Sequence, residues 1–177
     1  YVPAAPSTSF FSPVGPANAT HECAIATAAS RLWSGNYLNW ASMQTLDTFR
    51  WVLTGGFRST DTNTETRLTK TYAAEDSNNP NKLLSANVST STPFRAWNAA
   101  SSRVRNIGTA MRISQNGDVD SATTVDYNGQ YSGNAANAAY ANPDTIYLVY
   151  INVKVCDPTA GVGLESNCVA YRDGYKP

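Results

Sequence analysis

The sequence predicts an α+β domain, in which an antiparallel or mixed β-sheet packs against a long Trp-rich helix and long irregular loops join the elements. Three observations predict it: a helical stripe between residues 37 and 54, an alternating pattern at 107–127 and an apolar strand at 145–155. With 177 residues the chain is long enough to bury a core of its own. We assign residues 21–177 to this single domain and residues 1–20 to a Pro-rich extended arm.

The helix is predicted to be the largest contribution to the core. Apolar side chains recur at spacings of three and four, which places them on one stripe of a helix; they are Trp40, Met43, Leu46, Phe49 and Leu53. Ser34 or Asn36 is the expected capping side chain at its start, and Gly55 is expected to end it in a left-handed conformation. Burying each of these large side chains stabilises a fold by about 1.5–3 kcal/mol.

Two further patterns predict the sheet. Between residues 107 and 127, apolar and polar side chains alternate on both sides of an Asn-Gly dipeptide, which indicates a hairpin. A three-residue loop there sets Ile113 opposite Val119 and keeps the two apolar faces together. Residues 145–155 form the strongest strand, because one face is continuously apolar and the early half is apolar on both faces. We expect the helix to pack over that early half.

Composition argues against several classes of function. The chain carries 13 Lys and Arg against 13 Asp and Glu, so its zero net charge gives no electrostatic basis for binding nucleic acid or an anionic membrane. No apolar run reaches the ~18–20 residues that a membrane-spanning helix needs. Charged residues make up 15% of the chain. Average globular domains have roughly 25%, so this composition favours a secreted or surface-exposed protein.

The sequence offers no convincing catalytic, cofactor or metal motif, so we expect neither an enzyme nor a cofactor. His21 is the only histidine, and it lies in the same segment as Cys23, whereas a nucleophile and its base usually come from different elements. Asn116, Asp118 and Asp120 alternate as in half of a calcium loop. The downstream bidentate glutamate of such a loop is absent, and a turn at Asn116 explains the pattern.

The cysteines indicate the redox environment. Cys156 and Cys168 bracket a short loop containing Gly, Ala and Pro, and we predict a disulfide between them. Such a bond requires an oxidising compartment. Two reduced thiols are the alternative. Cys23 is then left over, either free or paired outside this chain.

Tyrosines mark a candidate contact loop. Residues 128–142 are a low-complexity run rich in Asn, Ala, Gly and Tyr, which we expect to form an exposed loop. Tyr127, Tyr131 and Tyr140 flank this run or lie within it. Rigid aromatic rings beside adaptable Asn side chains suit contacts with a protein or a glycan. The alternative is that these are ordinary surface tyrosines.

Two separated motifs resemble a known family. Residues 33–43 read Trp-Ser-Gly-Asn-Tyr-Leu-Asn-Trp-Ala-Ser-Met, followed by Asp-Thr-Phe-Arg at 47–50 and Leu-Thr-Gly-Gly at 53–56. Later, 153–157 read Val-Lys-Val-Cys-Asp, followed by Gly-Leu-Glu-Ser-Asn-Cys at 163–168 and Tyr-Lys-Pro at the end. In this order the motifs are similar to the N-terminal region of the type IV pilus tip-associated proteins of the PilC/PilY kind.

The resemblance implies a von Willebrand factor A-like region followed by a large β-propeller. The Asp-x-Ser-x-Ser metal-binding signature of such a region is absent from these residues, and so is the propeller. We therefore expect a piece of a longer protein, and we carry over no metal site.

The function implied by the resemblance is that of a non-enzymatic module of a type IV pilus-associated surface protein, acting in pilus assembly and adhesion. Its location would be the cell surface, and its partners would be pilins, minor pilins or a host or abiotic surface. The alternative is a self-associating extracellular fibre subunit processed from a longer precursor. The Pro-rich arm and Cys23 motivate this second hypothesis.

Overall fold

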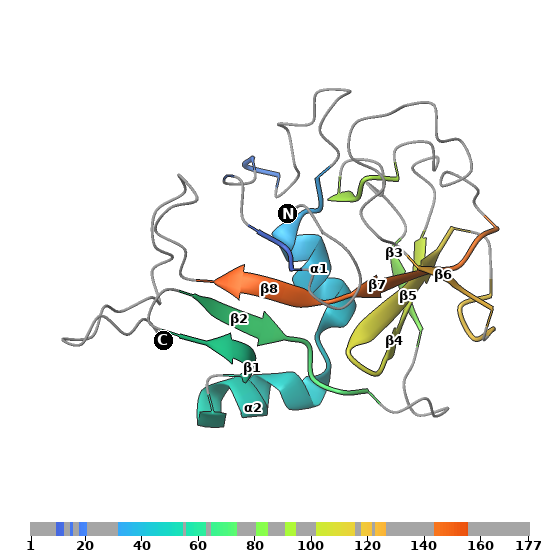
Figure 1. The fold of residues 1–177 in the computed structure, drawn as a ribbon. Helices are drawn as coiled ribbons and strands as arrows, with labels where there is room; N and C mark the ends of the chain where they lie inside the picture. Colours follow the sequence, from blue (N-terminus) through green and yellow to red (C-terminus); the bar gives the residue numbers. More distant parts are fainter. Residues whose placement is uncertain are drawn as a thin grey trace.

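The computed structural model of the chain describes residues 10–12, 15, 18–20, 32–54, 56–62, 65–73, 81–84, 91–94, 102–115, 118–121, 123–126 and 144–155. These residues form two short helices, α1 (Gly35–Ser42) and α2 (Thr45–Thr54), and eight strands (Figure 1). The strands are β1 (Phe57–Asp61), β2 (Thr66–Thr69), β3 (Lys82–Leu84), β4 (Ser102–Ile107), β5 (Ala110–Ser114), β6 (Val125–Asp126), β7 (Tyr147–Tyr150) and β8 (Asn152–Val155).

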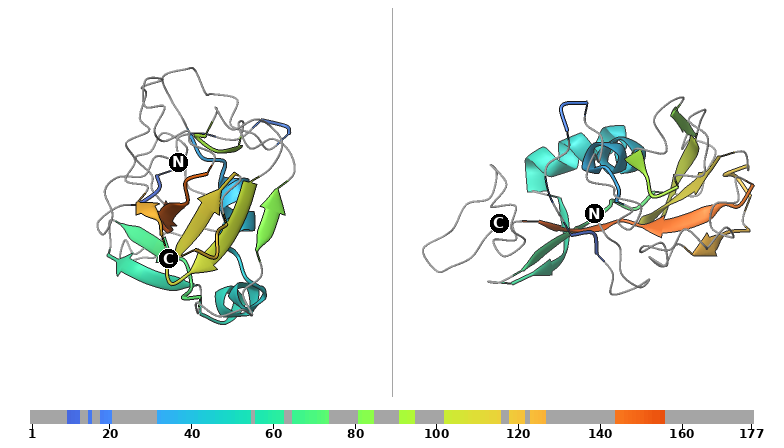
Figure 2. Two further views of the ribbon diagram at one scale, coloured as in Figure 1. Left: turned by 90° about the vertical axis from the view of Figure 1, so that its right-hand side faces the viewer. Right: turned by 90° about the horizontal axis from the view of Figure 1, so that it is seen from above.

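The strands form two sheets. Five strands pair in the order β3-β4-β5-β7-β6, antiparallel except for β6 and β7, and three pair antiparallel in the order β1-β2-β8. Only Ile151 separates β7 from β8, so one run of chain passes from the larger sheet to the smaller. The predicted strand over residues 145–155 is thereby confirmed, although it serves both sheets. The two helices lie on the same side of these sheets (Figure 2).

The hairpin lies earlier in the chain than predicted. β4 and β5 pair through a turn at Gly108, whose φ of 51° lies in the left-handed region that glycine adopts most readily. Ile113 therefore lies opposite Val104 of β4 and Tyr147 of β7, not opposite Val119. β5 is a central strand with all of its residues buried. Val119 is also buried, but it lies in a turn.

The predicted long helix is in fact two helices. The first ends at Ser42, because Met43 has an extended backbone with φ −71° and ψ 134°. Lys82 of β3 donates hydrogen bonds from Nζ to the carbonyl oxygens of Trp40 (2.6 Å), Ala41 (3.3 Å) and Met43. A continuous helix would have used these carbonyls as its own acceptors. A side chain from a distant part of the sequence therefore satisfies the end of α1.

A second helix begins directly after the break. The Asp47 carboxylate accepts a hydrogen bond of 2.6 Å from the backbone N–H of Gln44. This is half of a capping box, in which the third helical residue bonds back to the residue at the cap. The negative charge of Asp47 also lies at the positive end of the α2 dipole. Lys82 and Asp47 together explain why two short helices replace one long one.

The break takes the predicted stripe out of the core, so the predicted fold class with a long Trp-rich helix is wrong. Trp40, Met43, Phe49 and Leu53 are all exposed. The side chain of Leu46 lies outside the described part of the chain. In the residues that the structure describes, the fold is mostly β-sheet, with only short helices.

The core lies around Trp33, which is fully buried. Its ring lies edge-on to Phe11 with centroids 6.2 Å apart, tilted against Tyr37 at 5.9 Å and edge-on to Phe94 at 5.6 Å. Phe94 in turn stacks on Tyr147 of β7 at 5.1 Å. Such aromatic pairs contribute about 0.5–1.5 kcal/mol beyond the burial of their area. This aromatic cluster joins segments that are far apart in the sequence.

The first helix packs against β4 and β5 and buries Tyr37, Leu38 and Ala41. Ser34, one of the two predicted capping residues, accepts a hydrogen bond of 3.3 Å from the backbone N–H of Tyr37. The Tyr37 hydroxyl lies 3.1 Å from the Ser102 hydroxyl of β4 in a shared hydrogen bond. Burial raises the pKa of Tyr37 far above its usual value, so the ring stays neutral and anchors α1 to the sheet.

The segment after β2 joins the two sheets through Lys70. Its backbone N–H donates to the carbonyl of Ile151 at 2.9 Å. Its side-chain Nζ donates to the carbonyls of Thr71 at 2.7 Å and Gly108 at 3.2 Å. Ile151 lies between β7 and β8, and Gly108 lies between β4 and β5. One lysine thus bonds the end of β2 to the turn of the larger sheet.

The junction predicts how stability depends on pH. Burial lowers the pKa of Lys70 from 10.5 to about 8, while the Asp47 carboxylate raises it and the Lys82 ammonium lowers it. Between these two pH values, position 70 binds more protons in the unfolded chain than in the folded one. The unfolding free energy of the wild type should therefore rise, relative to that of Lys70→Met, as the pH increases from 8 to 10.5.

Urea unfolding of both proteins across this range measures the difference. The lysine-to-methionine change is a suitable comparison because it keeps the length of the apolar stem and removes only the ammonium. A difference that falls with rising pH would show instead that the charged ammonium stabilises the junction.

Candidate interaction surface

The second helix presents an apolar face to solvent. Phe49, Val52 and Leu53 are 65%, 71% and 79% exposed. Their spacing of three and four residues places them on one side of α2. We call these three residues the α2 face. The amphipathic stripe that predicted a core helix thus includes side chains that point outward.

Further exposed apolar residues lie close to the α2 face in the sequence. Phe57, the first residue of β1, is 62% exposed and follows Gly56, whose φ of 89° lies in the left-handed region. Before α2, Met43 is 48% exposed and Trp40 is 38% exposed. Scattered exposed apolar residues are normal, but a concentration of large ones marks an interaction site. Figures 1 and 2 show α2 beside the β1 side of the smaller sheet.

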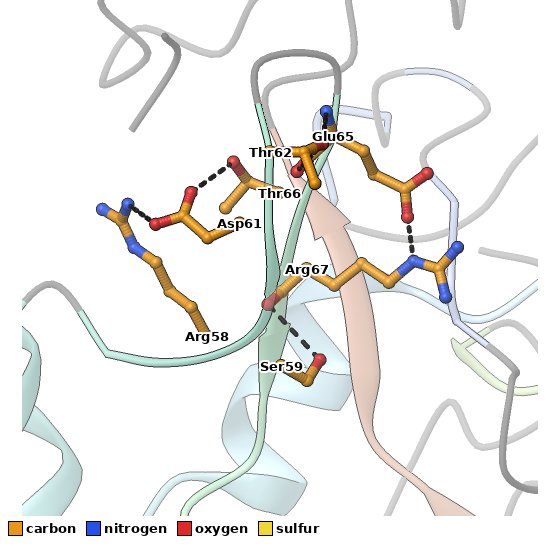
Figure 3. Close-up of polar contacts among 7 residues, drawn as sticks. All are labelled: Arg58, Ser59, Asp61, Thr62, Glu65, Thr66 and Arg67. Atoms are coloured by element: carbon orange, nitrogen blue, oxygen red, sulfur yellow. Dashed lines mark hydrogen bonds and ion pairs between the residues drawn. The ribbon is translucent and has the colours of Figure 1, made fainter.

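The hairpin that follows α2 carries charges that pair with one another. Arg58 forms an ion pair of 2.9 Å with Asp61, whose carboxylate also accepts a hydrogen bond of 3.5 Å from Thr66. Arg67 of β2 pairs with Glu65, which lies directly before that strand (Figure 3). Ion pairs near the surface, such as these partly exposed ones, contribute at most about 1 kcal/mol to stability. Because the charges balance, the hairpin gives a partner of either charge little electrostatic attraction beside the α2 face.

The other residues singled out in the sequence lie mostly outside the described part of the chain. These are the two cysteines of the predicted disulfide, Cys156 and Cys168, the additional thiol of Cys23, and the tyrosines of the predicted contact loop, Tyr127, Tyr131 and Tyr140. The disulfide and the contact loop therefore remain predictions from the sequence. The structure brings Trp40, Met43, Phe49 and Leu53 to the surface in one stretch of chain.

The alternating acidic residues after β5 have a structural role. The Asp120 carboxylate accepts hydrogen bonds from Arg105 of β4 and from Asn81 at 3.4 Å. The bond from Arg105 is the main cause that holds the pKa of Asp120 below its usual range. Asp118 accepts a hydrogen bond of 2.9 Å from the backbone N–H of Asp120. These contacts tie the loop to β4 and give Asp118 and Asp120 structural roles, whereas Asn116, the first residue of the pattern, lies outside the described residues.

Neither a metal centre nor a membrane span is found in the described residues. They include no group of three or more His, Cys, Asp or Glu side chains placed to hold a metal ion. No helix among them is long and apolar enough to cross a membrane.

Sequence reasoning missed this surface because it assumed that an amphipathic stripe faces the core. The available signal was local: Asp47 lies three residues after Gln44 and can cap a new helix at that point. Lys82 could not have been recognised as the side chain that ends α1, because nothing in its neighbours specifies that contact.

The fold and this surface define a small, mostly β domain, built of two sheets and two short helices in its described residues, with an apolar helix face open to solvent. Residues 5–134 match the family described as the small alpha/beta domain of PilY1 homologues, and the chain belongs to this family. The membership confirms the family resemblance seen in the sequence motifs.

A curated relative is named as a pilus biogenesis factor. The chain is 40% identical over 149 residues to a protein of Xylella fastidiosa named type IV pilus biogenesis factor PilY1 homolog. The match covers 82% of this chain but only 12% of the relative, so the chain spans about an eighth of that protein's length. No solved structure matches the chain.

Two leucines test the difference between the buried and the exposed helix face. Leu38 of α1 is 3% exposed, whereas Leu53 of α2 is mostly exposed. We expect Leu38→Ala to lower the unfolding free energy by about 2–5 kcal/mol, the usual result of creating a cavity in a core. Leu53→Ala should change it by about 0.5 kcal/mol or less. Chemical unfolding followed by tryptophan fluorescence measures both, and equal losses would show that α2 is buried in solution.

Proposed function

We propose that this domain is a non-enzymatic module of a type IV pilus-associated surface protein, and that it acts in pilus assembly and adhesion. Two observations support the proposal: the family match over residues 5–134 and the name of the Xylella fastidiosa relative, a pilus biogenesis factor. The relative is a much longer protein, so the activity of the whole polypeptide is itself part of this proposal.

The single observation that carries the mode of action is the α2 face. We propose that it binds another pilus protein, a pilin or a minor pilin. Residues at spacings of three and four on a short helix are the anchors by which a helix docks into an apolar groove. The paired charges of the neighbouring hairpin leave apolar contact as the main source of affinity. The partner surface would therefore be an apolar groove rather than a charged patch.

Export to an oxidising compartment belongs to the same proposal. A pilus-associated protein reaches the cell surface, where disulfides persist. The predicted bond between Cys156 and Cys168 would form during export, and Cys23 would remain free or pair outside the chain.

Charges placed on the α2 face test the proposed docking. We expect Phe49→Glu combined with Leu53→Glu, introduced into the chromosomal gene, to reduce surface piliation and attachment roughly tenfold or more. Burying unpaired charges in an apolar contact costs several kcal/mol, and about 1.4 kcal/mol already corresponds to a factor of ten. Pilus counts by electron microscopy, twitching motility and an attachment assay measure the effect.

Asn36→Glu is the matched control, because Asn36 is an exposed residue of α1, a different helix, and takes no part in the α2 face. It should leave piliation unchanged. Immunoblots must show equal amounts of every variant. Normal piliation and attachment in the double variant at normal protein levels would refute the proposed docking.

The predicted disulfide has its own test. Protein purified from the periplasm under non-reducing conditions should be lighter than the reduced protein by two hydrogen atoms, with the bond mapped to Cys156 and Cys168 by peptide mass spectrometry. Cys156→Ser combined with Cys168→Ser should lower the unfolding free energy by about 3 kcal/mol, because the unfolded chain regains the entropy of the open loop. Free thiols at both positions in the exported protein would show the prediction to be wrong.

A further inference from the structure

A segment near the N-terminus occupies the outer edge of β8. The backbone N–H of Phe11 donates to the carbonyl of Asn152 at 2.7 Å, and the N–H of Lys154 donates to the carbonyl of Phe11 at 2.8 Å. Phe11 thereby forms a parallel bridge with Val153. The other edge of β8 pairs with β2. Residues 10–12 therefore dock as a short additional strand, and we call them the docked arm.

The docked arm is recognised through two successive aromatic side chains. Phe11 is 1% exposed, and its ring lies edge-on to Trp33 with centroids 6.2 Å apart. The guanidinium carbon of Arg67 lies 3.8 Å from the centroid of the Phe10 ring, and Nζ of Lys154 lies 5.9 Å from it. One ring thus enters the core and the other lies against two cations, which is a specific pattern for an extended segment.

These contacts do not depend on which copy of the chain supplies the arm. Residues 13–31 connect the docked arm to Leu32 and Trp33, and the ring of Trp33 already contacts Phe11. A connection of this length can span up to about 60 Å when extended, far more than the separation that it has to bridge. The same hydrogen bonds and ring contacts would form with an arm from a second molecule.

We propose that copies of this chain exchange their docked arms, so that residues 10–12 of one copy pair with β8 of another. This goes beyond the proposed function, because the partner is a second copy and the surface is the edge of β8 rather than the α2 face. An arm linked to its own site has an effective concentration on the order of mM. The closed form therefore predominates in dilute solution, and exchange occurs where copies refold at high concentration.

Two variants of the 177-residue chain separate the arm from its acceptor. Phe11→Ala removes the buried ring and leaves the edge of β8 intact. Lys154→Pro removes the N–H that bonds to Phe11 and leaves the arm intact. Because that N–H points away from β2, the pairing of β2 with β8 is retained. Lys154→Thr is the matched control, because it changes the same side chain and keeps the N–H. All variants carry Cys23→Ser, which excludes dimers linked through that thiol.

The variants are refolded from urea separately and as an equal mixture at high concentration, and their mass is measured by size-exclusion chromatography with light scattering. We expect each variant alone to be monomeric and the mixture to contain a heterodimer, at least tenfold above the dimer of either variant alone. Replacing Lys154→Pro by Lys154→Thr should allow that variant to dimerise by itself. A mixture that remains monomeric would overturn the proposal.

Wild-type protein provides a test that does not depend on the folding of any variant. Equal amounts of nitrogen-15-labelled and unlabelled protein are refolded together, and a reagent with one amine-reactive end and one photoreactive end joins Lys154 to the docked arm, whose Phe10 ring centroid lies 5.9 Å from Nζ of Lys154. Arm exchange gives cross-linked peptides that combine both isotopes, in a proportion that increases with the protein concentration during refolding. Cross-links of a single isotope at every concentration would show that each arm stays on its own chain.

Discussion

The burial of Trp33 is the constraint on which the rest of the structure depends. Its ring contacts Phe11 of the docked arm, Tyr37 of α1 and Phe94, which stacks on Tyr147 of β7. An indole of this size buries a large apolar area only when several segments surround it. The arm, the first helix and the larger sheet therefore assemble around one side chain. Ser34, which caps the start of α1, directly follows Trp33 in the sequence.

Because α1 fills the space against the larger sheet, the second helix is left outside. Tyr37, Leu38 and Ala41 cover β4 and β5, and Lys82 ends the helix by binding its last carbonyls. The chain then starts α2 with its apolar side chains exposed. This surface and the edge of β8 are the two places at which we propose that other chains bind, one through helix side chains and one through backbone pairing.

Much of the local structure could be predicted from the sequence. The strand over residues 145–155, the capping role of Ser34 and the family resemblance were all present in short segments. The position of the hairpin could not be predicted in the same way. The Asn-Gly dipeptide is a strong local turn signal, whereas a single glycine such as Gly108 is a weak one, and only the pairing of β4 with β5 shows that the turn lies there. The candidate site was recognised only as a stripe of apolar side chains, and its exposure could not be inferred.

The sequence by itself determined which side chains share a face, since periodicity is a property of neighbouring residues. It therefore placed Phe49 and Leu53 on one side of a helix and made residues 145–155 extended. The tertiary structure decided which of these faces is buried. That choice depends on Lys82, which binds the end of a helix distant from it in the sequence, and on Trp33, which is buried beside Tyr37 of α1.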